Sequence, residues 1–332
     1  MAAPAPPPAA DGELSKINEK SDVSARYDIP EPEPFISFNA LKDRIRHHYE
    51  LASDYYYSLW GEHIHHGYFL TPSDSKERAQ VQLIELLLER SGLPEGSTVL
   101  DVGCGIGGTT RYLARVHQCK VVGVTISGRQ VEIARKLTLE ASGGPPGTPD
   151  TGAAAGLGGG SVQFIELDAE KMGDHFTVEP HVARFDCVWI SEAMSHLPNK
   201  ELFFRNAALL LNPGGKLVVA DWFKSEDLTE KQFKDDISPI EDGMLLPPLC
   251  AQSDYVRLAN EAGLKTFAEP FDISKQVSKT WDISWTLIQN PALWAFAVAQ
   301  GRDGLAFMQA FRAMRRGFAN GTFRYAVMAF QK

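Results

Sequence analysis

The sequence predicts an α/β fold with a mostly parallel sheet of seven strands, covered by helices on both faces. Between residues 96 and 222, short apolar runs alternate with amphipathic helical patterns, which is typical of a parallel sheet between two layers of helices. The first apolar run ends in a glycine-rich turn that opens a helix. Sheets of this kind bind ligands beyond the carboxyl ends of their strands, so we expect function in the turns that follow the strands.

Seven segments have the length and apolar character of buried strands. In chain order they are residues 97–101, 120–124, 162–165, 185–190, 216–220, 266–273 and 323–331. A helical pattern follows the first strand, and a second helix opens at Ser127, which forms a capping-box pattern with Gln130. Further helices are expected at about 199–211 and from Ser253 or Asp254 onward.

Composition divides the chain of 332 residues into segments. Residues 1–35 are rich in Ala, Pro and charge, so we expect a disordered lead-in. Residues 36–95 are expected to form N-terminal lid helices, and residues 96–332 the main domain. Residues 141–160 contain eight Gly and three Pro, which predicts a flexible surface insertion. A block rich in Trp and Phe between the last two strands predicts a helical cap at residues 274–320.

Charge and cysteine content exclude several classes of protein. The chain has 33 basic and 42 acidic residues, and its net charge of −9 gives no general attraction to nucleic acid. Its four cysteines are scattered without a CxxC pair, which excludes a disulfide framework and fits a reducing compartment. No apolar run reaches the ~18 residues of a membrane helix, and the N-terminus lacks the features of a secretory signal. We therefore expect a cytoplasmic protein.

The turn after the first predicted strand carries the clearest functional signal. Gly103, Gly105 and Gly108 form a G-x-G-x-x-G pattern there, and such glycines let a ligand approach the backbone at a helix N-terminus. A nicotinamide site needs an acidic residue about 20 residues later, but the second strand ends in Gly-Val-Thr-Ile. Asp101, two residues before the first glycine, suits a ligand with an ammonium group better than a pyrophosphate. A nicotinamide-dependent oxidoreductase stays as the alternative.

The motif DVGCGIGG at 101–108, with GVTIS at 123–127 and the glutamine that follows, resembles the class I S-adenosylmethionine-dependent methyltransferases. The resemblance covers residues 43–332 and includes HIHHGYF, SEAMSHLP and SDYVRLANEAGL. It is strongest to the gamma-tocopherol methyltransferase-like subgroup, which is related to sterol C-methyltransferases and cyclopropane synthases. The resemblance implies a Rossmann-like methyltransferase fold, S-adenosylmethionine as the cofactor and a small-molecule acceptor.

The resemblance also implies a cofactor site. Asp101 and the glycine turn would hold the methionine part, Gln130 the ribose and Asp168 the adenine, with one tyrosine of the lid above them. The implied cofactor-binding residues are Tyr49, Asp101, Gly103, Cys104, Gly105, Thr125, Ile126, Gln130, Asp168, Ala169 and Ser191. Each polar residue has a structural alternative: Gln130 as the capping partner of Ser127, Asp101 as a turn cap and Asp168 as an ordinary helix N-cap.

Glu192 and His196 are the candidate catalytic residues. They follow the fourth strand at an i, i+4 spacing, which brings two side chains to one side if the chain enters a helical turn there. An imidazole that titrates near neutral pH can take a proton from the acceptor, and Glu192 would orient it or hold an amine. The alternative is that His196 only packs. His63, His65 and His66 lack acidic or cysteine partners at a set spacing, so no metal is expected.

The Trp and Phe of the cap suggest an apolar or aromatic acceptor, although a cap that needs its own core explains them equally well. O-, N- and C-methylation all stay open at this level, and we expect a role in secondary metabolism. So does a weak association with membranes, and the sequence does not determine the oligomeric state. Besides the oxidoreductase, the other alternative is a catalytically silent, methyltransferase-like binding protein.

Overall fold

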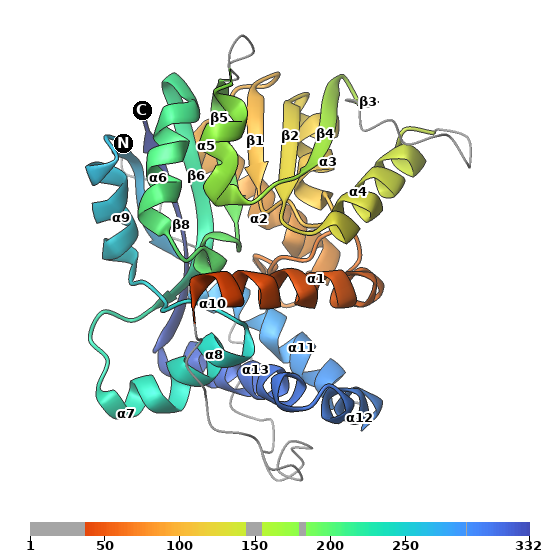
Figure 1. Ribbon diagram of the computed structural model, residues 1–332, viewed down its shortest axis with the longest axis vertical. Helices are drawn as coiled ribbons and strands as arrows, with labels where there is room; N and C mark the ends of the chain where they lie inside the picture. The colour runs from red at the N-terminus through yellow and green to blue at the C-terminus, as the bar shows by residue number, and fades with distance from the viewer. Residues whose placement is uncertain (1–36, 144–154, 179–183, 290) are drawn as a thin grey trace.

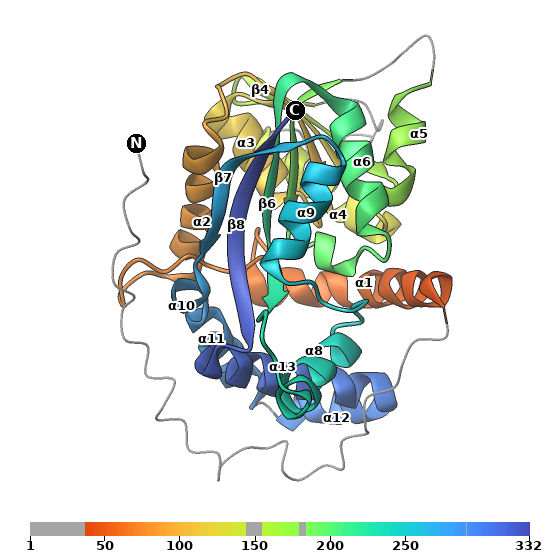
Figure 2. The same cartoon turned by 90° about the vertical axis from the view of Figure 1, so that its left-hand side faces the viewer.

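The computed structural model describes residues 37–143, 155–178, 184–289 and 291–332. The predicted lead-in at residues 1–35 and most of the predicted glycine-rich insertion lie outside these residues. Figures 1 and 2 show a twisted sheet with helices on both faces and a second group of helices below one edge of the sheet. Within the described residues, no helix is long and apolar enough to cross a membrane.

The sheet has eight strands in the order β3-β4-β2-β1-β5-β6-β8-β7. The neighbours β4, β2, β1, β5 and β6 are parallel, whereas β8 runs antiparallel to both β6 and β7. The strands are β1 (Thr98–Val102), β2 (Lys120–Thr125), β3 (Ala155–Leu157), β4 (Gly160–Glu166), β5 (Phe185–Ser191), β6 (Leu211–Lys224), β7 (Lys265–Asp272) and β8 (Phe323–Gln331).

The structure has one strand more than the seven predicted. The additional β3 lies within the predicted insertion and pairs antiparallel with β4. Gly158 and Gly159 connect the two strands with φ angles of 60° and 98°, which a two-residue hairpin turn requires and which glycine adopts without strain. Composition alone indicated a loop because the many surrounding glycines and prolines obscured this hairpin signal.

Helices cover both faces of the sheet. The helices are α1 (Phe38–Trp60), α2 (Lys76–Ser91), α3 (Gly108–His117), α4 (Gly128–Ala141), α5 (Met172–Phe176), α6 (Lys200–Leu210), α7 (Glu230–Gln232), α8 (Ser238–Gly243), α9 (Gln252–Glu261), α10 (Ser274–Val277), α11 (Lys279–Ile288), α12 (Pro291–Ala299) and α13 (Arg302–Asn320). Short 3₁₀ turns lie at Ala169–Lys171 and Met194–His196, and a π turn at Phe233–Ile237.

The sheet has a hydrophobic core on each face. Val99 and Leu100 are neighbours in β1 and both are fully buried, yet they belong to different cores, because successive side chains of a strand point to opposite faces. Helices α2, α3 and α4 contribute to the core of Val99, and α5, α6 and α9 to that of Leu100. Burial on both faces explains why the strands are apolar throughout.

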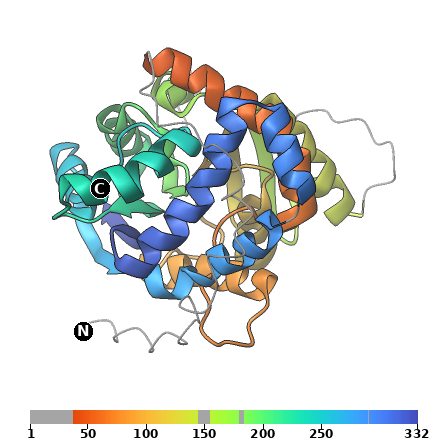
Figure 3. The ribbon, with the colours of Figure 1, turned by 90° about the horizontal axis from the view of Figure 1, so that it is seen from below.

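The helices between β7 and β8 lie below the carboxyl ends of the parallel strands, as the view from below shows (Figure 3). Trp285 and Trp294 form a small core within this group, whereas Trp281, Met314 and Phe318 join the core of the sheet. The long helix α1 runs across the same edge of the sheet, above the cap helices in Figure 1. The strand ends are therefore roofed by α1 and by the cap.

Candidate active site

A pocket of about 240 Å³ lies between the strand ends, α1 and the cap. Its lining comes from the turns after β1, β2, β4 and β5, from α1 and from the loop at residues 62–68, which we call the lid loop. All the predicted cofactor-binding and catalytic residues line this one pocket: Tyr49, Asp101, Gly103, Cys104, Gly105, Thr125, Ile126, Gln130, Asp168, Ala169, Ser191, Glu192 and His196.

The glycine turn needs glycines because other parts of the chain approach it closely. Gly103 has a φ of 72°, and a Cβ there would lie 2.3 Å from the Cβ of Ala193. A Cβ at Gly105, whose φ is 54°, would lie 2.9 Å from Cδ1 of Ile64 in the lid loop. The backbone N–H groups of Gly103 and Cys104 both donate to the carbonyl of Val124. The close approach of Ala193 and Ile64 therefore excludes side chains at Gly103 and Gly105, and the turn lines the pocket with its backbone.

Asp101 is buried at the end of β1 and accepts a hydrogen bond of 2.6 Å from the Thr110 hydroxyl. Burial raises the pKa of Asp101 to about 6, against a smaller lowering by the Thr110 bond. A cationic group nearby, such as the ammonium group expected of the ligand, would stabilise the ionised carboxylate of Asp101. Because Thr110 lies on α3, the bond between Thr110 and Asp101 is not a cap of the glycine turn, which was the structural alternative for Asp101.

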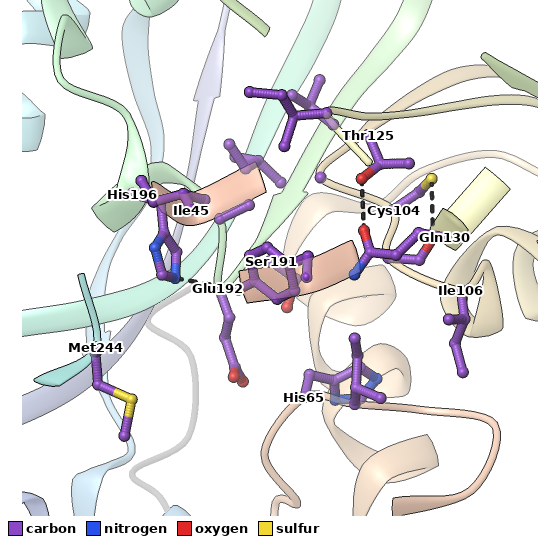
Figure 4. Close-up of a pocket in the computed structure, with 18 of the residues that line it drawn as sticks. Ile45, His65, Cys104, Ile106, Thr125, Gln130, Ser191, Glu192, His196 and Met244 are labelled. Carbon is purple, nitrogen blue, oxygen red and sulfur yellow. Dashed lines mark hydrogen bonds between the residues drawn. The ribbon is translucent and has the colours of Figure 1, made fainter. Parts of the chain in front are cut away.

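Gln130 bonds to a side chain of the preceding strand. Its Oε1 accepts a hydrogen bond of 2.6 Å from the Thr125 hydroxyl, as Figure 4 shows. Ser127 caps α4 by accepting from the backbone N–H of Gln130. The Gln130 side chain therefore bonds to Thr125 at the pocket, and capping by Ser127 needs only its backbone.

Asp168 is the N-cap of the 3₁₀ turn at Ala169–Lys171, which was the structural alternative for this residue, and it also pairs with Lys42. Its Oδ1 accepts from the backbone N–H of Glu170, and its Oδ2 lies 3.0 Å from Nζ of Lys42. Lys42 also pairs with Glu170 at 2.5 Å. Burial lowers the pKa of Lys42, but its bonds to the two carboxylates outweigh this and raise it overall. These ion pairs fasten α1 to the end of β4.

Glu192 is held by three hydrogen bonds from outside its own turn. Its Oε1 accepts from the backbone N–H of His66 at 2.7 Å and from the Tyr325 hydroxyl at 2.8 Å. Its Oε2 lies 2.8 Å from Nδ1 of His66. Burial raises the pKa of Glu192, but the charge and hydrogen bonds of His66, together with the charge of His65, outweigh burial and hold that pKa below its usual value. The backbone φ of Glu192 is 55°, a strained conformation for this residue.

His196 lies at the end of the 3₁₀ turn that follows β5, and its Nε2 is 3.4 Å from the Tyr49 hydroxyl. Burial and then the charge of Glu192 raise the pKa of Tyr49 to about 12, so this hydroxyl stays protonated at neutral pH. Figure 4 shows the Glu192 carboxylate extending toward the side lined by His65, with the His196 ring on the other side. The bonds of Glu192 thus orient His66, and not His196 as the spacing suggested.

Two residues that line the pocket, Lys42 and Trp222, and the Glu192 partner Tyr325 were absent from the predicted set. Trp222 directly follows Asp221 near the carboxyl end of β6. It could have been predicted, because ligands bind beyond the carboxyl ends of the parallel strands. Tyr325, the partner of Glu192, lies near the start of β8. Because β8 is antiparallel, its start lies beside the ends of the parallel strands. Lys42 lies on α1 and carried no signal in the sequence.

A mostly parallel sheet, a glycine turn after its first strand and a pocket beyond the strand ends define an α/β enzyme that binds a nucleoside-containing ligand. Residues 93–263 match the family model described as a methyltransferase domain, and residues 38–144 match that of mycolic acid cyclopropane synthetase. The chain belongs to the methyltransferase-domain family, as a class I S-adenosylmethionine-dependent methyltransferase of the tocopherol methyltransferase-like subgroup. Its cofactor is S-adenosylmethionine.

Individual relatives agree with this assignment. A probable tocopherol O-methyltransferase of Oryza sativa subsp. japonica, named as chloroplastic, is 28% identical over 88% of this chain and 78% of its own. The O-methyltransferase cnsE of Penicillium expansum is 30% identical over 65% of this chain and 70% of its own. The crystal structure of geranyl diphosphate C-methyltransferase from Streptomyces coelicolor A3(2), which contains S-adenosyl-L-homocysteine, has a TM-score of 0.64 at 16% identity, covering 91% and 99% of the two chains. It shares the fold.

Proposed function

We propose that this methyltransferase acts on a small apolar or aromatic metabolite. The observation that supports this most directly is the lining of the pocket on the cap side. Trp222, Trp281, Met244, Phe307 and Phe311 all contribute apolar or aromatic surface there. A pocket of that composition binds an apolar ring or chain and keeps water away from it.

S-adenosylmethionine supplies a methyl group bound to a positively charged sulfur. Gly103 and Gly105 line the pocket without side chains, which leaves the backbone of the turn accessible to the extended methionine part of this molecule. We propose that Asp101 faces its ammonium group, and that Gln130 and Asp168 bind the ribose and the adenine. The remaining residues proposed to contact it, from α1 and the turns after β1, β2, β4 and β5, are Tyr49, Cys104, Thr125, Ile126, Ala169 and Ser191.

The residues proposed to act at the acceptor are His196 and Glu192. Both line the pocket, and they flank the turn that follows Ser191. Tyr49 lies against the His196 ring, with ring centroids 6.0 Å apart, and closes the pocket from α1. This arrangement keeps the acceptor in contact with His196 and excludes water.

Calorimetry with S-adenosylhomocysteine and turnover with radiolabelled S-adenosylmethionine test the proposal together. The His196→Ala variant should lose most of its turnover and keep the affinity of the wild type for S-adenosylhomocysteine. The Gly105→Arg variant should lose that affinity, and NADPH, the matched control ligand, should not bind the wild type. Products formed from apolar extracts of the producing cell identify the acceptor by mass spectrometry. Methylation confined to proteins or polar metabolites would refute the acceptor class.

We also propose a cytoplasmic location and a role in secondary metabolism. The four cysteines are free thiols, which supports a reducing compartment. Cell fractionation followed by immunoblotting distinguishes the cytoplasm from an organelle such as the chloroplast, to which the rice relative is assigned by its name. Recovery of the protein in the organelle fraction would refute the location.

A further inference from the structure

The imidazole of His66 is held in a fixed orientation at the pocket. The residue is buried, and both its backbone N–H and its Nδ1 are bound to Glu192. The carboxylate is in turn fixed by the Tyr325 hydroxyl. Since Glu192 accepts hydrogen bonds as an ionised carboxylate, the proton of a neutral His66 lies on Nδ1. The lone pair of the ring is then on Nε2.

That Nε2 is buried and has no hydrogen-bond partner among the described residues. The same is true of the indole Nε1 of Trp222 and of Trp281, whose rings lie 5.8 Å and 5.2 Å from the His66 ring between centroids. All three residues line the pocket. One acceptor atom and two donor atoms are thus left without partners within one aromatic cluster, where buried polar groups normally find partners.

We propose that His66 is the general base of this enzyme and that the acceptor it serves is a hydroxyl group, so that the reaction is an O-methylation. A hydroxyl donates to an imidazole nitrogen and accepts from indole N–H groups at the same time, so it matches the cluster. A protonated amine has no lone pair for the indoles, and a carbon nucleophile without a neighbouring hydroxyl offers neither kind of bond. This inference rests on the proposed function and narrows its acceptor class.

The proton transfer balances within the residues present. The acceptor oxygen forms a bond to the methyl carbon while the bond from that carbon to sulfur breaks, and the electron pair of the broken bond stays on sulfur. The hydroxyl proton moves to Nε2 of His66, and the oxygen keeps the electron pair of its O–H bond. One positive charge is lost at sulfur and one appears on the imidazole, beside the ionised Glu192. Glu192 is a positioning residue in this step.

His196 is less suited to receive the proton. The Tyr49 hydroxyl lies 3.4 Å from its Nε2 and occupies that nitrogen in either tautomer, because it donates to a lone pair there or accepts from an N–H. In this scheme His196 touches the acceptor without taking its proton.

The tautomer of His66 tests the proposal without any turnover. Protein labelled with ¹⁵N-histidine is examined by long-range ¹H–¹⁵N NMR at mildly alkaline pH, and the His66 signal is assigned by its absence from the His66→Asn variant. We expect the proton on Nδ1 in the wild type and a loss of this preference in Glu192→Gln. A proton on Nε2, or a doubly protonated ring, would overturn the proposal because neither form has the required lone pair.

The hydroxyl class is tested with 4-nitrophenol, whose phenolate absorbs visible light. With S-adenosylhomocysteine present and the pH near the pKa of free 4-nitrophenol, binding to the wild type should raise the phenolate fraction. The His66→Asn variant should lose this rise and keep its affinity for S-adenosylhomocysteine, whereas Val298→Ala, at an exposed position outside the pocket lining, should keep both. Tyr325→Phe, which retains the bond between Glu192 and His66, should weaken the rise without abolishing it.

Kinetics with the acceptor found by mass spectrometry complete the test. The His66→Asn variant should lose turnover by about 100-fold or more, the usual contribution of a general base. An equal phenolate signal in wild type and His66→Asn, or a loss confined to His196→Asn, would overturn the role of His66. Failure of 4-nitrophenol to bind, or a product methylated on nitrogen or carbon, would overturn the hydroxyl class. Because S-adenosylhomocysteine binding and methyl transfer to an apolar product are measured separately, neither of these results touches the proposed function.

Discussion

Replacement of Gly103 by alanine should lower both the stability of the protein and its affinity for the cofactor. The same replacement at Gly96 separates the two causes, backbone strain and steric overlap. Gly103 and Gly96 have nearly the same backbone conformation, with φ angles of 72° and 76°. A Cβ at Gly96 would meet no atom within 4 Å, whereas a Cβ at Gly103 would lie 2.3 Å from the Cβ of Ala193. Gly96→Ala therefore introduces only the backbone strain, and Gly103→Ala introduces the same strain together with a steric overlap.

The expected magnitudes follow from these two contributions. A left-handed conformation costs an alanine about 1–2 kcal/mol, which is the whole loss expected for Gly96→Ala. Forcing an extra methyl group into a packed site costs about 1–3 kcal/mol more, so Gly103→Ala should lose about 2–5 kcal/mol. Displacement of Ala193 also moves the turn that carries Glu192. We expect the affinity for S-adenosylhomocysteine to fall by about tenfold or more, equivalent to ~1.4 kcal/mol.

Urea unfolding gives the stability changes and calorimetry gives the affinities. The double variant Gly103→Ala/Ala193→Gly supplies the critical comparison. Without the Ala193 Cβ, the nearest atom to the new methyl group is the Ala193 Cα at 3.7 Å, an ordinary contact. The double-mutant cycle should therefore show a favourable coupling that recovers the steric part of the loss. Equal losses for Gly96→Ala and Gly103→Ala, or no coupling to Ala193, would refute this account of the glycine turn.

Three further changes test other parts of the molecule. Burial raises the pKa of Asp101 from 3.8 to about 6, so between these pH values the folded state binds more protons than the unfolded chain and its stability falls as pH rises. Urea unfolding across this pH range should show a smaller fall in stability for Asp101→Asn than for the wild type. An identical pH profile for the two proteins would contradict this. Gln130→Met should weaken binding of S-adenosylhomocysteine in calorimetry by about tenfold, while the control Ser127→Ala should lose ~1 kcal/mol of stability and keep the affinity. Trp294→Ala, in the core of the cap, should cost about 3–5 kcal/mol in thermal or urea unfolding, against almost nothing for the exposed Val298→Ala on the same helix.

Local sequence patterns predicted the sheet well because burial on both faces imposes apolar runs on parallel strands. The strand predicted at residues 323–331 coincides with β8, and the one at 120–124 lies within β2. The predicted 216–220 covers only the centre of β6, which runs from Leu211 to Lys224. Antiparallel pairing with β8 extends this strand to Lys224. That pairing depends on residues about a hundred positions away, which local patterns do not contain.

The candidate site divides in the same way. The glycine turn, Asp101 and the residues after each strand were accessible from sequence, because strand order and a resemblance fix which turns meet at one edge. The partners of Glu192 were not accessible, since its spacing to His196 suggested a pair within one helical turn. In the structure the chain forms a short 3₁₀ turn instead, and the carboxylate bonds to His66 and Tyr325.

The sequence by itself determined the class of the fold and the turns that line the pocket, because periodicity and the glycine motif are local properties of the chain. The cofactor followed from the resemblance of its motifs to a known family. Only the tertiary structure decided which side chains are paired at the pocket. Lys42, His66, Glu192 and Tyr325 lie on four separate segments, and no local rule links them. Hydrogen bonds and ion pairs between distant segments form only when packing buries them together, and at this pocket packing left His66 with a fixed ring and an open nitrogen.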